Sequence, residues 1–216
     1  LAREIGATPI EMDVLRDAEI EAGIARAEKT LGPIAILVTA AGVLQRPRAP
    51  EDLPMAEWDR VLATNLRGTY RCCALVGAEM ATRERGAIVT ISSVMGATPG
   101  PLHAYGPAKA AIMNLTQSLA AEWAPRGVRV NGVAPGFVAT PALKRAAAFK
   151  FVDEEQLAKA HAQGRLPTAE EVANAIVFLA SDLASGITGV TLPVDGGYLA
   201  ASGWRGFDNA LSSRSE

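Results

Sequence analysis

Two side chains near the middle of the chain have the types and the spacing to move a proton. The stretch AYGPAKAAI, residues 104–112, places Tyr105 one helical turn before Lys109, and positions i and i+4 lie on one face of a helix. An ammonium group beside a phenol favours the phenolate and lowers the phenol pKa from about 10. By itself such spacing is more often an ordinary amphipathic turn, so the surrounding residues decide its meaning.

A serine supplies a third group. The apolar run AIVTIS, 87–92, is typical of a buried strand, and Ser93 follows it directly. The serine would orient a carbonyl or alcohol oxygen held beside Tyr105, and the phenol would exchange a proton with that oxygen, provided that Lys109 draws its pKa toward neutrality. Side chains cannot transfer a hydride and no metal-ligand spacing is visible, so we expect a hydride-carrying cofactor. The predicted chemistry is carbonyl–alcohol redox.

Hydrophobic periodicity predicts strands that alternate with helices around these residues. Strand character falls at 8–14, 34–38, 87–92, 128–134 and 190–195, and helical spacing at 17–31, 54–82, 104–124 and, after a Thr168–Glu171 capping box, 169–181. Such alternation predicts a parallel sheet with helices on both faces. Residues 139–165 are polar, Ala-rich and poorly periodic, which favours a mobile flap.

The carboxyl ends of parallel strands are the place where such sheets bind ligands. That rule selects Asp13, the TAAG stretch at 39–42, the two serines at 92 and 93, and APGFVAT at 134–140. We therefore expect these residues to lie along one edge of the sheet.

The composition limits the class of protein. The chain has 216 residues, of which 49% are hydrophobic and 20% charged, with a net charge of −2. This is typical of a globular domain and provides no basic surface for nucleic acid. We expect neither a membrane span nor a signal peptide. Cys72 and Cys73 are adjacent within a helical pattern and are expected to be buried thiols in a reducing cytoplasm.

Taken together, the motifs resemble the short-chain dehydrogenase/reductase family over residues 1 to about 200. The matching segments stand in the family's order: Asp13 after a strand, TAAG where NNAG is usual, ATNLRGTY with Asn65, IVTISSVMG with Ser93, YGPAK with Tyr105 and Lys109, VRVNGVAPGFVAT, and VDGG. The resemblance implies a Rossmann-like, doubly wound parallel sheet in a domain of residues 1–200, followed by a C-terminal tail, 201–216. It also implies NAD or NADP as the cofactor.

The resemblance implies specific roles for these residues. Tyr105 would be the general acid and base, Lys109 would lower its pKa and hold the nicotinamide ribose, and Ser93 would stabilise the substrate oxygen. Asn65 would hold a water that relays protons from Lys109 to solvent. The other residues expected to contact the cofactor are Asp13 and Val14 at the adenine, Ala41 and Gly42 beside the dinucleotide, and Pro135, Gly136, Val138 and Thr140 at the nicotinamide end.

Two of these roles have alternatives. Ser92 is the other candidate for the active serine, although the family's S-x-x-G spacing fits Ser93 with Gly96. Asn65 is alternatively a residue that hydrogen-bonds helix backbone.

The remaining histidines and tryptophans have simpler interpretations. His103 is more simply a pocket wall or surface residue than a second base, and His161 lies in the flap without a partner that the sequence identifies. The three tryptophans are expected to anchor the core or an interface: Trp58, Trp123 and Trp204.

Two features depart from the family's pattern. Thr39 and Ala40 stand where two asparagines are usual; Ala40 makes no side-chain hydrogen bond, so altered cofactor affinity is expected. The loop T-G-x-x-x-G-x-G, which cradles the cofactor's diphosphate, does not occur. A βαβ unit takes about 30 residues or more, so the chain is expected to be N-terminally truncated. The segment 8–14 would then lie beside no strand or pair directly with 34–38.

These observations predict an NAD(P)-dependent oxidoreductase acting on a small secondary alcohol or ketone, such as a 3-oxoacyl, sugar-alcohol or cyclic-alcohol substrate. The alternative is a truncated relative that keeps the catalytic residues, binds no dinucleotide and serves as a scaffold or subunit. The family's habit of pairing its long helices predicts a homotetramer or dimer. Three apolar positions suit either the core or that contact: Ile112, Leu115 and Leu119.

Overall fold

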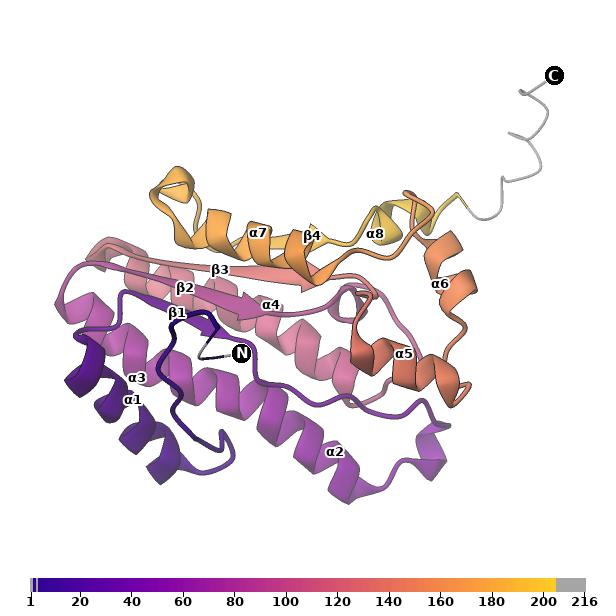
Figure 1. The fold of residues 1–216 in the computed structure, drawn as a ribbon, viewed down its shortest axis with the longest axis horizontal. Helices are drawn as coiled ribbons and strands as arrows, with labels where there is room; N and C mark the ends of the chain where they lie inside the picture. The colour runs from indigo at the N-terminus through magenta and orange to yellow at the C-terminus, as the bar shows by residue number, and fades with distance from the viewer. Residues whose placement is uncertain (1, 3, 205–216) are drawn as a thin grey trace.

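A parallel β-sheet lies at the centre of the molecule in a computed structural model, which describes residue 2 and residues 4–204 (Figure 1). The strands are β1 (Ile36–Thr39), β2 (Gly86–Ile91), β3 (Val128–Pro135) and β4 (Thr191–Val194), in the order β1-β2-β3-β4. Each neighbouring pair is parallel, with Val38 opposite Val89 and Val89 opposite Asn131. The carboxyl ends of all four strands therefore lie at one edge, as predicted.

Helices connect the strands and cover the sheet. They are α1 (Asp17–Leu31), α2 (Met55–Leu62), α3 (Thr69–Thr82), α4 (Tyr105–Trp123), α5 (Pro141–Ala148), α6 (Glu154–Ala160), α7 (Ala169–Ala180) and α8 (Tyr198–Ala201). The capping box predicted at the start of α7 is present, since the Thr168 and Glu171 side chains each accept a hydrogen bond from the other's backbone N–H. No helix in the described part of the chain is long and apolar enough to cross a membrane.

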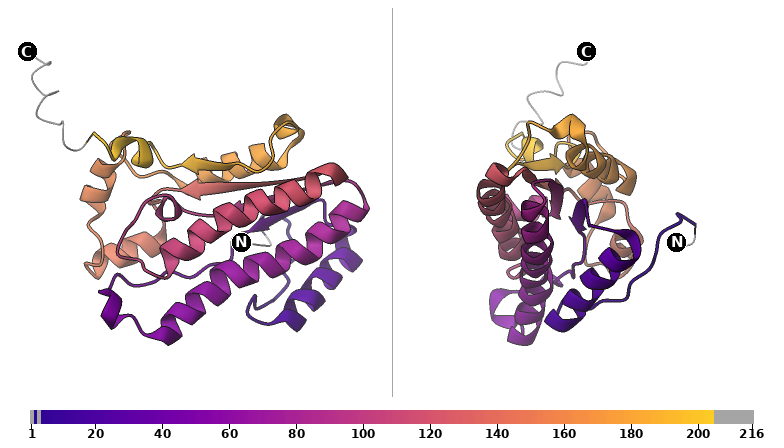
Figure 2. Two further views of the ribbon diagram at one scale, coloured as in Figure 1. Left: turned by 180° about the vertical axis from the view of Figure 1, so that it is seen from behind. Right: turned by 90° about the vertical axis from the view of Figure 1, so that its left-hand side faces the viewer.

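The core has two parts, one on each face of the sheet. Neighbouring side chains on a strand point to opposite faces, so Ile88 and Val89 of β2 enter different clusters. Ile88 packs in the cluster that contains Met80 of α3 and Trp123 of α4, whereas Val89 packs with Leu179 of α7. Figure 2 shows α3 and α4 on one side of the sheet and α7 on the other. The doubly wound arrangement predicted from the sequence is confirmed.

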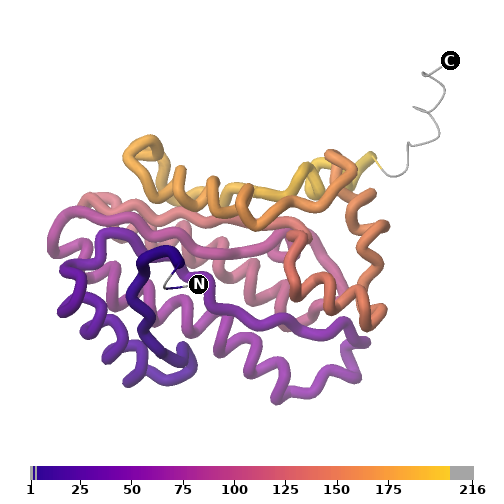
Figure 3. Tube along the Cα trace, in the orientation of Figure 1, coloured from indigo at the N-terminus to yellow at the C-terminus, as the bar shows by residue number. Residues whose placement is uncertain are grey.

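The strand predicted at 8–14 is wrong. This segment pairs with no strand and turns at Asp13, whose Oδ1 accepts a hydrogen bond from the Leu15 N–H at 2.9 Å; its path can be followed in Figure 3. A strand needs a neighbour to pair its backbone groups, and within the described residues β1 pairs only with β2. The first of the two arrangements expected for a truncated sheet is therefore the one observed.

One face of β1 is uncovered within the described residues. Ile36 is 52% exposed and Val38 is 37% exposed, whereas Leu37, between them, packs against the cluster on the α3 side. Strands of parallel sheets are typically apolar on both faces because helices cover both. In β1 the apolar side chains of Ile36 and Val38 are exposed because no described element covers this face.

The flap predicted at 139–165 contains two helices, α5 and α6, instead of irregular chain. Side chains just before each helix explain its start: the Thr140 hydroxyl accepts a hydrogen bond from the Leu143 N–H at 3.2 Å, with Pro141 as the first helical residue. The Asp153 carboxylate caps α6 in the same way. The hydrophobic periodicity of the sequence did not indicate these helices, because both are short and have no buried residue.

The helix predicted at 54–82 is nearly continuous, but it contains a π-helical segment, Ala63–Gly68, between α2 and α3. Such segments are rare and often accompany functional residues; this one contains Asn65. The apolar positions of α4 serve the core of this chain, since Ile112 and Leu119 are buried and Leu115 packs against the core cluster.

The cysteines and tryptophans mostly follow expectation. Cys72 and Cys73 are free and buried, as predicted, and burial raises the pKa of the Cys73 thiol to about 12. Trp123 is a core residue, Trp58 is half-buried, and Trp204 is 60% exposed. The predicted tail falls largely on 205–216, outside the described residues.

Candidate active site

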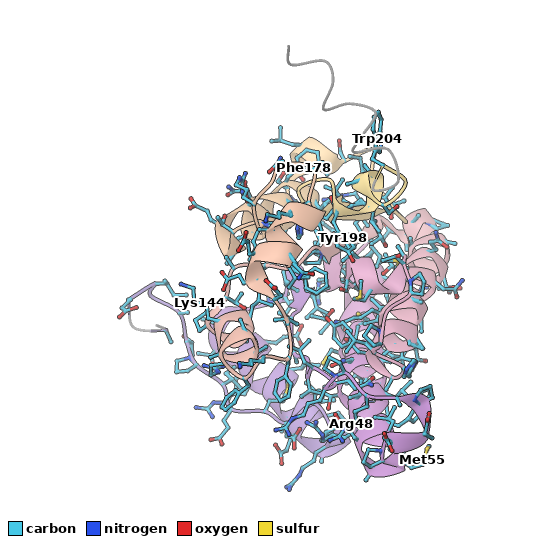
Figure 4. The ribbon with its side chains drawn as sticks, turned by 90° about the vertical axis from the view of Figure 1, so that its right-hand side faces the viewer. Arg48, Met55, Lys144, Phe178, Tyr198 and Trp204 are labelled. Atoms are coloured by element: carbon cyan, nitrogen blue, oxygen red, sulfur yellow. The ribbon has the colours of Figure 1, made fainter. Side chains whose placement is uncertain are left out.

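A cavity of about 570 Å³ lies at the carboxyl ends of β2 and β3. Figure 4 views the molecule from this end, with Lys144 marking α5 and Arg48 marking the loop after β1. The uncharged polar side chains in the lining are Gln45, Ser92, Ser93, Tyr105 and Thr140, and most of the other lining residues are apolar. The cavity thus brings the predicted serine and tyrosine together.

Gln45 fixes the start of the helix that carries Tyr105. Tyr105 is the first residue of α4, and Ala104 before it has no side chain to cap the helix. The Gln45 Oε1 atom accepts hydrogen bonds from the N–H groups of Ala104, at 2.6 Å, and Tyr105, at 3.2 Å. The Gln45 side chain, from a loop distant in sequence, therefore caps the N-terminus of α4. Sequence reasoning missed this residue because no local motif identifies it.

Gln45→Leu is expected to lower both stability and turnover. The leucine leaves two backbone N–H groups at the start of α4 without an acceptor, which typically costs ~1–2 kcal/mol, and kcat is expected to fall about tenfold with little change in KM because Tyr105 loses its fixed position. Urea unfolding and steady-state kinetics measure the two effects. Gln45→Glu keeps the acceptor oxygens and is the matched control. An unchanged unfolding free energy and kcat in Gln45→Leu would contradict the positioning role.

Lys109 lies on the same face of α4 as Tyr105, as its spacing predicts. Its Nζ donates a hydrogen bond to the Ile91 carbonyl at 2.7 Å and stands 5.5 Å from the centroid of the Tyr105 ring. The residue is only 5% exposed, and burial lowers the pKa of the Lys109 ammonium to about 8. A buried ammonium thus lies behind the phenol ring.

The sequence predicts that Lys109 lowers the pKa of the Tyr105 phenol, and for the chain without a bound cofactor this prediction is wrong. Burial raises the pKa of the Tyr105 phenol, and a hydrogen bond with Ser93 lowers it by less. The physical reason is that the apolar surroundings penalise the phenolate, while the Lys109 ammonium is directed at the Ile91 carbonyl. The phenol therefore keeps its proton at neutral pH.

The geometry separates the two serines. Ser93 interacts with the Tyr105 phenol, and its Oγ also accepts a hydrogen bond from the Met95 N–H at 3.2 Å. Ser92 is only 2% exposed. Its hydroxyl donates a hydrogen bond to the Lys109 carbonyl at 2.7 Å, which connects the end of β2 to α4. Gly96 allows the turn after Ser93 to approach α4, since a Cβ there would lie 2.7 Å from the Lys109 carbonyl carbon. This arrangement favours Ser93 as the active serine.

Asn65 ties down the loop after β1. Its Oδ1 accepts a hydrogen bond from the Val43 N–H at 2.7 Å, and its Nδ2 donates to the Val43 carbonyl at 2.9 Å. Gly42 lies directly beside it, where a Cβ would be 3.2 Å from the Asn65 Oδ1. The partner is thus a loop rather than its own helix, and the proton-relay role of Asn65 stays a prediction.

The residues predicted to hold the cofactor divide into two groups. Those expected at the nicotinamide end line the cavity with Tyr105: Pro135, Gly136, Val138 and Thr140. Those expected at the adenine, Asp13 and Val14, and those expected beside the dinucleotide, Ala41 and Gly42, do not line it.

Local contacts account for the residues outside the cavity. Asp13 lies in an exposed turn, and Val14 packs against Gly68. At the end of β1, the Thr39 Oγ1 is buried and has no hydrogen-bond partner within the described residues, so this threonine does not replace the polar contacts of the asparagine usual at its position.

The two histidines do not join the reacting groups. His103 is half-buried and lines a separate depression with Pro99 and Gly100. His161 is 2% exposed, contacts the Leu157 carbonyl through Nδ1 at 2.7 Å and packs near Phe137. The sequence did not identify these partners because they depend on how the segment 139–165 folds back.

Comparison with known proteins decides the family. The sequence model of a family described as Enoyl-(Acyl carrier protein) reductase matches residues 1–199. The chain is 39% identical over 192 residues to 2-(S)-hydroxypropyl-CoM dehydrogenase 3 of Xanthobacter autotrophicus, a match that covers 87% of this chain and 75% of that relative. The chain belongs to the short-chain dehydrogenase/reductase family.

Other proteins resemble this short-chain dehydrogenase/reductase over similar lengths. An inactive 2-(S)-hydroxypropyl-CoM dehydrogenase 2 from X. autotrophicus is 38% identical over 92% of this chain and 89% of that one. A solved structure of a protein named ribose-5-phosphate isomerase, from Brucella melitensis 16M, superposes with a TM-score of 0.94 at 50% identity, covering 95% of this chain and 80% of that one. The structure of ElxO with NADP bound superposes with a TM-score of 0.86 at 31% identity, covering 91% and 80%.

The family assignment makes this short-chain dehydrogenase/reductase an oxidoreductase whose cofactor is NAD or NADP. The residues present fit the nicotinamide end of such a cofactor. An ammonium has three N–H donors, and the one hydrogen bond described for Lys109 goes to Ile91, so donors remain for ribose hydroxyls next to Tyr105. The residues expected at the adenine end, Asp13 and Val14, do not line this cavity.

Proposed function

We propose that this short-chain dehydrogenase/reductase interconverts a ketone and a secondary alcohol through Ser93, Tyr105 and Lys109. The observation that carries the proposal is the meeting of the Ser93 and Tyr105 hydroxyls in one largely apolar cavity, with the buried Lys109 ammonium behind the Tyr105 ring. When bound, the nicotinamide supplies or accepts the hydride. The protein residues then need only handle the oxygen and its proton.

Each residue has a distinct task in this reaction. The Ser93 hydroxyl donates a hydrogen bond to the substrate oxygen and orients it. The Tyr105 hydroxyl donates its proton to that oxygen as the carbonyl becomes an alcohol, and the positive charge of Lys109 stabilises the phenolate that remains. Asn65, whose side chain hydrogen-bonds to the Val43 backbone, is proposed to hold a water that relays protons between Lys109 and solvent.

The protonation state of Tyr105 suits the first step of ketone reduction. Burial raises the pKa of Tyr105, so the phenol holds the proton that it would donate to the ketone oxygen, whereas alcohol oxidation would begin from the phenolate. Small secondary alcohols and ketones suit the cavity, which is mostly apolar. A cytoplasmic homodimer or homotetramer remains part of the proposal by analogy with the family.

A non-catalytic scaffold is the second candidate. The predicted adenine-side residues Asp13 and Val14 do not line the cavity, and one relative of similar extent is named as inactive. A chain that cannot hold a dinucleotide would keep Tyr105 and Lys109 without using them.

Calorimetric titration of the folded chain with NADH and then NADPH tests the proposal. We expect micromolar binding of one of them, followed by consumption of that reduced cofactor with small apolar ketones. Failure of both to bind the folded chain would favour the scaffold. One similar structure is named as an isomerase. If the chain binds a cofactor but reduces no ketone, and converts an aldose to a ketose without any cofactor, an isomerase function would replace the proposed hydride transfer.

A further inference from the structure

The cavity beside Tyr105 has positive charge in its lining and no negative charge. Among the described residues that line it, the charged ones are Arg46, on the loop after β1, and Arg145, on α5; none is Asp or Glu. The two elements lie next to each other at this end of the molecule (Figure 1), and the ring of Phe151, just beyond α5, lies 5.6 Å from the Arg46 guanidinium. Two parts of the chain thus contribute one cation each.

Neither guanidinium group is neutralised within the described residues. The guanidinium groups of Arg46 and Arg145 form no ion pair there. The Arg46 backbone N–H donates to the Glu57 Oε1 atom at 3.2 Å, but it is the guanidinium of Arg48, two positions further along, that pairs with this carboxylate, at 3.5 Å. Both residues are accessible to solvent. A guanidinium binds carboxylate, sulfonate or phosphate oxygens through several N–H donors at once, so this pair is free to bind an anion.

The arginines and the reacting hydroxyls occupy different depths of the cavity. Ser93 is 8% exposed and contacts the half-buried Tyr105, whereas the arginines lie at the solvent-exposed mouth. Apolar lining residues complete the wall, among them Leu102 and Leu143. A ligand that fills the cavity would meet hydroxyls at its inner end, apolar side chains along its body and guanidinium groups at its outer end.

We propose that this cavity selects substrates with three parts: a ketone or secondary alcohol, an apolar body and an anionic group at the far end, held by Arg46 and Arg145. The position of the reacting group rests on the proposed function, but the anion preference rests on the arginines alone. The other source of anionic oxygens is the diphosphate of the cofactor, so the experiment separates the two.

The test compares acids with their methyl esters, which have nearly the same shape and no charge. The probes are 4-oxocyclohexanecarboxylate, which is rigid, and 6-oxoheptanoate, which is flexible. Calorimetry gives the affinity of the full chain for each acid and ester, alone and with NADH, and for NADH itself. The variants are R46Q with R145Q, and R26Q as a matched control, because Arg26 is an exposed arginine on α1 with no ion pair in the described part of the chain.

We expect at least one acid to bind about tenfold more tightly than its ester, a preference that weakens as salt is raised. The double variant is expected to lose this preference, and Arg26→Gln to keep it. This result supports the anion site even if no probe is reduced, so failure of the proposed chemistry is a separate outcome. Equal binding of acids and esters by the parent chain, or a preference that persists in the double variant while NADH affinity falls, would overturn the proposal.

Discussion

Replacement of Tyr105 by Phe is expected to reduce kcat about 10³-fold, within the range typical of a lost general acid. The phenylalanine ring fills the same space at the start of α4, and the backbone N–H that donates to Gln45 is unchanged. Folding and cofactor affinity should therefore stay close to those of the parent chain, while proton transfer to the substrate oxygen is lost. Rates of NADH and NADPH consumption with a ketone, together with a calorimetric titration of each cofactor, measure the two quantities separately.

A matched control is available on a neighbouring helix. Tyr70→Phe removes a hydroxyl from a side chain on α3 that is 51% exposed and does not line the cavity, so its kcat should be unaffected. The assigned mechanism is wrong if Tyr105→Phe retains full turnover. A loss of turnover that is accompanied by equal loss of cofactor binding would instead indicate damage to the fold around α4.

Lys109→Met is expected to produce the second largest effect, with opposite signs for activity and stability. Removing the ammonium should lower kcat by ~10²-fold or more, since the phenolate left on Tyr105 loses its nearest positive charge. Stability at pH 7 should rise, because methionine removes the cost of burying a charged ammonium. That cost is seen in the pKa of Lys109, which burial lowers from 10.5 to about 8; each pKa unit corresponds to about 1.4 kcal/mol. The gain is partly offset by the Ile91 carbonyl, which loses its donor.

The stability gain expected for Lys109→Met depends on pH. The unfolded chain binds more protons than the folded chain between the two pKa values, so the penalty of the buried charge is fully present below about pH 8 and fades toward pH 10.5. The stability advantage of Lys109→Met should therefore shrink by roughly 2 kcal/mol between pH 7 and pH 10. Urea unfolding at both pH values measures it. Lys29→Met, at an exposed position of α1, is the control, and an advantage that is independent of pH would contradict a buried charged lysine.

The order of strands and helices and the position of the reacting groups were predictable because they depend on local patterns. Short apolar runs identified β1 to β4, and the spacing of Tyr105 and Lys109 placed both on one face of α4 because a helix repeats every 3.6 residues. Ser93 could be placed with them because the carboxyl ends of parallel strands share an edge. None of these steps needs knowledge of distant contacts.

The errors arise where a residue depends on a distant partner. The apolar pattern at 8–14 suits a strand, but a strand forms only beside another strand, and no described strand lies there. Residues 139–165 have weak periodicity, yet side-chain caps begin α5 and α6. The Tyr105 pKa moves up instead of down because the degree of burial, which no local spacing reveals, outweighs the hydrogen bond with Ser93 that lowers it.

The sequence by itself determined which chemical groups this protein has and which of them share a helix face or a strand end, because those relations follow from backbone geometry over a few residues. Only the tertiary structure decided what surrounds them. It placed Gln45 beneath the start of α4, directed Lys109 at the Ile91 carbonyl and brought Arg46 and Arg145 to one cavity. These contacts join residues far apart in the chain, and burial, charge and pKa depend on such contacts rather than on sequence neighbours.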